Sequence, residues 1–222
     1  MNFAMFIFFS TLEVITFFCF VLVLFRFPVK PYIWQFTIVS FMLSLVSNSL
    51  QQEELQQISS IVQIVLCICF VVFFLKVHYF NAMMMIITGY IVVFIIQSIL
   101  LGVFLHYEVF TSIKAYTVDG YIVQTISSSL VFLFSLLIYV FKGGFSFIDS
   151  TSRFKRQKLF VRENRVYFIF LVLAILIVAG SNFIYQRASH PPFLMISVIL
   201  TLALVALLSL SIKKDELLSK SI

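Results

Sequence analysis

Charged residues are scarce in this sequence. Asp, Glu, Lys and Arg make up 11% of its 222 residues, while hydrophobic residues make up 62%. Soluble domains carry about 25% charged residues, so the composition excludes that class. No loop between the apolar runs is long enough to hold a second folded domain. The sequence therefore predicts a single all-α membrane domain.

Cysteine is also rare, and the sequence lacks the features of a cleaved signal peptide. The three cysteines, Cys19, Cys67 and Cys69, all fall inside apolar runs, where a thiol behaves as a small hydrophobe. A disulfide framework is not expected from such positions. The start of the chain has neither the basic region nor the small-residue cleavage site of a signal peptide, so we interpret the first apolar run as a retained span.

Catalytic motifs are absent from the sequence. It contains no His-Glu-x-x-His, glycine-rich phosphate loop, Cys-x-x-Cys pair or Gly-x-Ser-x-Gly elbow. The closest constellation is Cys67 and Cys69 with His78, but the histidine falls two or more helical turns beyond the thiols. An intramembrane peptidase is therefore disfavoured, and we expect neither an enzyme nor a cofactor or metal site.

Long apolar runs dominate what is present. A helix needs about 20 apolar residues to cross a bilayer core of roughly 30 Å. Seven runs reach that length, near residues 3–25, 32–50, 57–75, 82–105, 121–141, 166–184 and 193–212. We expect a seven-helix membrane domain over residues 1–212 and a cytoplasmic helical tail over residues 213–222. The alternative is an even number of spans with one segment that re-enters the same face.

Lysine and arginine divide unevenly between alternate loops. Thirteen of the 15 fall on one side, and only Lys114 and Arg187 fall on the other. Bases are retained on the cytoplasmic face of membrane proteins. The distribution predicts a multi-pass protein of the inner cell membrane, with its N-terminus outside and its C-terminus in the cytoplasm.

A single carboxylate, Glu13, lies near the middle of the first run. A central acidic residue costs about 2.5–3.5 kcal/mol to insert and usually marks a functional site. In the predicted topology, amides and hydroxyls of other spans fall in the same outer half of the membrane. The expected ligand-binding residues are Glu13, Asn48, Gln63, Gln97, Gln124, Ser128 and Asn182. Together they predict an outward polar cavity with Glu13 at its floor.

The same polar side chains allow a structural interpretation. Amides between membrane helices form hydrogen bonds worth about 0.6 kcal/mol each. Glu13 can likewise be a protonated acid that is hydrogen-bonded to Gln97 or Gln63. Any one amide favours this interpretation, whereas the gathering of the whole set in one leaflet favours a ligand site.

The loop after the fifth run is strongly basic. Between residues 153 and 165 it carries six bases and one acid, interleaved with apolar residues. The bases are Arg153, Lys155, Arg156, Lys158, Arg162 and Arg165. This pattern predicts a helix on anionic lipid of the inner leaflet, at about 1 kcal/mol per base. A solvated connector is the alternative, and no nucleic-acid partner is expected because the topology already accounts for the bases.

Several short motifs resemble those of one group of membrane domains. They are Glu13 followed by Leu24-Phe25-Arg26-Phe27-Pro28-Val29-Lys30, then Phe41-Met42-Leu43-Ser44-Leu45-Val46-Ser47, and Thr88-Gly89-Tyr90 with Gln97. The chain is similar to the N-terminal sensor domains of accessory-gene-regulator-type quorum-sensing histidine kinases from Gram-positive bacilli. The resemblance implies a multi-span domain that binds an extracellular peptide pheromone and continues into a cytoplasmic kinase module. The residues after Ile212 look like the start of such a linker, but they contain no phosphoacceptor histidine or ATP-binding segment.

These observations predict a receptor-like membrane protein. It is expected to recognise a small extracellular ligand or peptide pheromone and to signal to a cytoplasmic partner or through a homodimer. Two alternatives come from other classes: a substrate-binding subunit of a transporter, and a structural or immunity-type membrane protein without a ligand.

Overall fold

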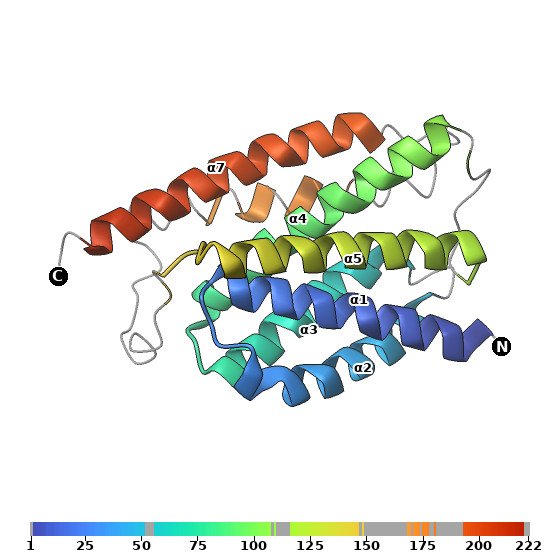
Figure 1. Ribbon diagram of the computed structural model, residues 1–222, viewed down its shortest axis with the longest axis horizontal. Coiled ribbons are helices and arrows are strands. Elements are labelled where there is room, and N and C mark those ends of the chain that lie inside the picture. The colour runs from blue at the N-terminus through green and yellow to red at the C-terminus, as the bar shows by residue number, and fades with distance from the viewer. Residues whose placement is uncertain are drawn as a thin grey trace.

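The fold is entirely helical in the part of the chain that the structure, a computed structural model, describes. The described residues are 2–51, 56–107, 109, 116–146, 148, 168–169, 171–173, 175–177, 180 and 193–219. Their helices are α1 (Asn2–Leu24), the 3-10 helix η1 (Lys30–Tyr32), α2 (Ile33–Leu50), α3 (Gln56–Leu75), α4 (Tyr79–His106), α5 (Val118–Val140) and α7 (Phe193–Ser219) (Figure 1). The predicted all-α fold is confirmed.

Six helices of this described part are long and apolar enough to cross a membrane. The predicted run over residues 166–184 falls mostly outside it, although residues 171–173 and 175–177 are helical. Two helices begin three residues earlier than predicted, because polar side chains cap them. His78 accepts a hydrogen bond from the Phe80 amide at 3.3 Å, and Thr117 accepts one from the Gly120 amide at 3.2 Å.

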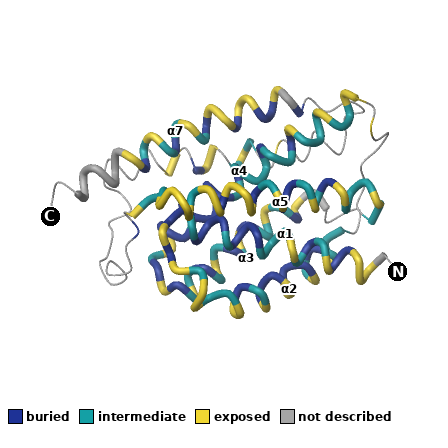
Figure 2. Tube along the Cα trace, in the orientation of Figure 1, coloured by how far each residue is buried: buried dark blue, intermediate teal, exposed yellow. Residues whose placement is uncertain are grey.

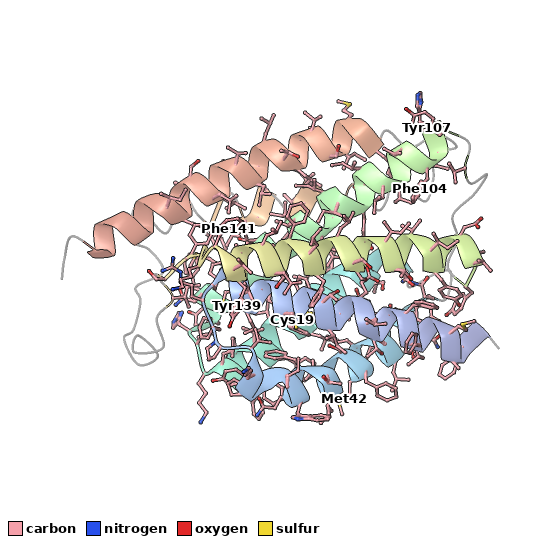
Figure 3. The ribbon with its side chains drawn as sticks, viewed as in Figure 1. Cys19, Met42, Phe104, Tyr107, Tyr139 and Phe141 are labelled. Carbon is pink, nitrogen blue, oxygen red and sulfur yellow. The ribbon has the colours of Figure 1, made fainter. Side chains whose placement is uncertain are left out.

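The helices form a bundle whose outer surface carries many large apolar side chains. α1 packs against α2, α4 and α5, and α7 covers α4 (Figure 1). Phe18 and Phe36 are buried between α1 and α2, with ring centroids 4.5 Å apart. On the outside, Trp34 and Phe73 are 79% and 73% exposed, Met42 points away from the bundle (Figure 3), and exposed positions recur along every helix (Figure 2). Such a surface belongs in lipid, so the chain is a multi-pass membrane protein.

α1 and α4 are in close contact at Gly89. A Cβ added there would lie 2.4 Å from Val21 Cγ2 and 3.2 Å from Phe17 Cε2, so only glycine fits without displacing a neighbour. The two helices run antiparallel. Gln97, two turns beyond Gly89 on α4, is therefore opposite Glu13, two turns before Val21 on α1.

The C-terminal ends of α1 and α5 are joined by backbone contacts. Phe145 donates its amide to the Leu24 carbonyl at 2.8 Å. Arg26 donates through Nε to the Gly143 carbonyl at 3.2 Å and through Nη2 to the Lys142 carbonyl at 2.9 Å. These bonds hold the C-terminal ends of the two helices side by side, and Phe9 stacks on Tyr121 near the other end at a ring-centroid distance of 5.0 Å.

Candidate functional site

The crossing of α1 and α4 joins Glu13 to a side-chain amide. Gln97 donates from Nε2 to Glu13 Oε1, and Gln124 of α5 also faces this carboxyl group. Thr16 uses its hydroxyl within α1, donating to the Glu13 carbonyl at 2.8 Å. Glu13 therefore has amide neighbours on two other helices, as a costly intramembrane carboxyl group requires.

A cavity of about 360 Å³ lies against the Glu13 side chain. Polar side chains from five helices line it: Ser10 and Glu13 of α1, Ser47 of α2, Ser59, Ser60 and Gln63 of α3, Tyr90 and Gln97 of α4, and Gln124 of α5. Phe6, Phe17 and Phe94 supply aromatic walls. Its volume falls in the range of small-ligand pockets, about 300–1,000 Å³, and it combines apolar walls with a few convergent polar groups, as such pockets do.

Four of the predicted ligand-binding residues line this cavity: Glu13, Gln63, Gln97 and Gln124. They come from four helices. The predicted convergence of amides on the carboxyl group is thus present in the structure for this subset.

Asn48 and Ser128 lie elsewhere. Asn48 Oδ1 accepts a hydrogen bond from the Tyr116 hydroxyl at 2.8 Å, and burial raises the pKa of Tyr116 above its ordinary value. Ser128 lines a separate groove of about 310 Å³ between α1 and α5, with Leu12 and Phe132. Neither residue lines the Glu13 cavity.

The remaining predicted residues cannot be placed. Asn182 and the basic set between residues 153 and 165 lie outside the described residues. Their predicted roles stay predictions.

The sequence reasoning missed several lining residues that helical spacing indicates. Tyr90 lies seven residues before Gln97 on α4, and Ser59 lies four residues before Gln63 on α3. Residues at these spacings share one face of a helix. Each predicted amide therefore marked a polar face, and the hydroxyl one or two turns away belongs to the same site.

The side chains that line the cavity are mainly hydrogen-bonding and apolar groups. No group of three His, Cys, Asp or Glu side chains that could hold a metal occurs within the residues described. Cys67 lines the cavity, whereas the His78 side chain is engaged in capping α4. The carboxyl group, the amides and the Tyr90 hydroxyl offer both donors and acceptors to a bound molecule.

Comparisons with known proteins assign no family: no family model matches the chain, and neither a curated protein nor a solved structure matches it. The resemblance to quorum-sensing sensor domains stays a prediction.

Proposed function

We propose that this protein is a receptor-like membrane protein that recognises a small ligand in the cavity around Glu13. The observation that supports it is the convergence of polar side chains from five helices on one carboxyl group inside an apolar bundle. Isolated polar groups are costly in a membrane. A ligand that pairs with the set offsets that cost, whereas scattered structural amides need no shared cavity.

The distribution of bases supports an outward orientation of the cavity. Among the described residues every lysine and arginine lies toward the end where α1, α3, α5 and α7 finish: Arg26, Lys30, Lys76, Lys142, Lys213 and Lys214. The cavity takes its α1 residues from the other half, between Phe6 and Phe17. With the bases in the cytoplasm, the cavity faces outward and the N-terminus lies outside.

The direction of the helices supports a seventh span. α5 and α7 run in the same direction along the bundle (Figure 1). A helix over the predicted run 166–184 would return the chain from the end of α5 to the start of α7. We propose the full seven-span arrangement in the inner cell membrane on this basis.

α7 offers a route from the cavity to the cytoplasm. It packs along α4, the helix that carries Gln97 and Tyr90 of the cavity. A ligand held by these side chains favours one packing of α4 against α7, and α7 runs on to Ser219 beyond the apolar run. The proposed output is a shift of that cytoplasmic segment toward a partner or a second copy.

One observation favours a second candidate function. The Gln97 amide already donates to Glu13, as it would if Glu13 were a structural acid that holds α1 to α4. In that case the protein is a non-catalytic structural membrane protein, and the cavity is a gap in helix packing that binds no ligand.

Glu13→Gln distinguishes the two candidate functions. It replaces the carboxyl group by an amide of the same shape, and it keeps an oxygen that can accept the hydrogen bond from Gln97. Purified protein is screened by thermal shift against small molecules and extracellular peptides. A ligand at 100 times its Kd is expected to stabilise the wild type by about 2.7 kcal/mol. Glu13→Gln should lose most of that gain while keeping the melting temperature of the free protein.

Asn48→Leu is the matched control, because Asn48 has the predicted depth of the site residues but lies outside the cavity. It should keep the ligand-induced gain. If Glu13→Gln keeps the melting temperature of the free protein and no ligand distinguishes the two proteins, the ligand site is overturned and the structural candidate is correct.

A further inference from the structure

A second and larger cavity lies at the opposite end of α1 and α5. Its volume is about 920 Å³, and three bases line it: Arg26, Lys30 and Lys142. Phe27 and Ile138 form apolar walls, and Tyr139, which is 69% exposed, lies at its edge (Figure 3). The Glu13 cavity shares none of these residues, so the two sites are independent.

The charge of this cavity is unbalanced. None of the described side chains that line it is acidic. The C-terminal ends of α1 and α5 each bring a partial charge of about −0.5, and Arg26 is directed at the carbonyls of Lys142 and Gly143, just after α5. These contacts do not neutralise the charges of Lys30 and Lys142. The third guanidinium nitrogen of Arg26, which makes neither of the two hydrogen bonds, lies beside these two cations.

The bases sit on a backbone that holds them in place. Arg26 and Lys142 have positive φ angles of 55° and 50°, which end their helices at these residues. Gly144, with a φ of 96°, approaches α1 so closely that an added Cβ would lie 2.6 Å from the Leu24 carbonyl oxygen. The Arg26 guanidinium, which its two hydrogen bonds already hold in place, loses little conformational entropy when it binds an anion.

The position of the three bases in the membrane indicates which kind of anion this cavity binds. The cluster lies where α1 and α5 leave their apolar runs, which is the depth of lipid headgroups, and Tyr139 and Phe141 at the end of α5 are exposed aromatic residues of the kind enriched at that depth (Figure 3). We propose that this cavity binds the phosphate of an anionic phospholipid. Lys30, Lys142 and the free nitrogen of Arg26 contact the phosphate, and the acyl chains lie along Ile138 and Phe27.

The test compares lipids of different charge on the purified full-length chain. Binding of phosphatidylglycerol and of phosphatidylcholine is measured by native mass spectrometry from a neutral detergent. The wild type is expected to prefer phosphatidylglycerol at least tenfold. Lys30→Gln should lower its affinity for that lipid about fivefold, and Lys30→Gln with Lys142→Gln about 30-fold, as expected for one and two bases near an anionic surface.

Lys76→Gln is the matched control, because Lys76 is also an exposed base with a positive φ, 54°, at the same end of the bundle but outside the cavity. It should change the affinity less than twofold. Three results overturn the proposal: an equal loss in Lys76→Gln, equal binding of phosphatidylcholine, or full displacement of the lipid by millimolar inorganic phosphate. The single variant Lys30→Gln keeps the test valid if the double variant does not fold.

Discussion

The two halves of α1 meet α4 in different ways. Near the C-terminal end, Val21 and Phe25 are fully buried, and the two helices touch at Gly89. Two turns away the same helices are separated by a cavity, and Glu13 is only half-buried beside it. The tight half contains glycine at the contact, whereas the open half has Tyr90, Phe94 and Gln97 along α4. Large side chains hold helices apart and a glycine lets them approach, so the cavity is a consequence of where the glycine lies.

Because of this difference, one half of α1 contributes mainly to the stability of the protein and the other half mainly to ligand binding. The tight half offers buried apolar contacts that any substitution disturbs. The open half offers hydrogen bonds of smaller energy and space for a ligand. Substitutions in the tight half should therefore cost the most stability, and substitutions in the open half should change binding with little cost.

The largest effect is expected from Gly89→Leu, which breaks the tight half. The new side chain has no room beside Val21, since even its Cβ would lie 2.4 Å from Cγ2. Overpacking of this kind costs about 1–3 kcal/mol. Thermal unfolding in detergent should show a clearly lowered midpoint.

Gly143→Ala is the control for Gly89→Leu. A Cβ there meets its nearest neighbour, Ile138 Cγ2, at 3.5 Å, which is ordinary contact. It should leave the midpoint almost unchanged. A Gly89→Leu protein as stable as the wild type would show that the crossing is not as close as described.

A smaller effect is expected from Gln97→Ala in the open half. It removes the donor to Glu13, and hydrogen bonds between membrane helices are worth about 0.6 kcal/mol, with a maximum near 1.7 kcal/mol. A double-mutant cycle with Glu13→Ala, followed by thermal unfolding, measures the coupling. Additive effects of the two substitutions would mean that the pair contributes nothing to stability.

The smallest effect is expected from Thr11→Val between α1 and α2. Thr11 donates its hydroxyl to Ser44 at 3.0 Å, so its loss should cost about 0.6 kcal/mol. Thr37→Val is the control, because its hydroxyl bonds within its own helix, to the Ile33 carbonyl at 2.8 Å. If both variants unfold at the same midpoint, the hydroxyl contact between the helices has no net energy.

Much of the fold follows from local sequence. Apolar runs of about 20 residues predict spanning helices without knowledge of their neighbours, and six such helices are found in the described residues. The starts of α4 and α5 were misplaced, because His78 and Thr117 cap helices that hydropathy alone begins later. Capping depends on single side chains that a search for apolar runs does not weigh.

The candidate site was predictable only in part. Glu13 stood out because a carboxyl group is costly in hydrocarbon, and Gln63, Gln97 and Gln124, which were grouped with it by their predicted depth, line the same cavity. Asn48 and Ser128 share that predicted depth but do not line this cavity. Depth is a property of position along a helix, whereas membership of a cavity also depends on rotation about the helix axis.

The sequence by itself determined that this chain is a bundle of membrane-crossing helices with one acid among apolar residues, since the energy of placing each residue in lipid is local. Only the tertiary structure decided which polar groups meet. The contact at Gly89 sets the distance and register between α1 and α4, and that register puts Gln97 opposite Glu13. Such pairings depend on how two surfaces fit together, and no single helix contains that information.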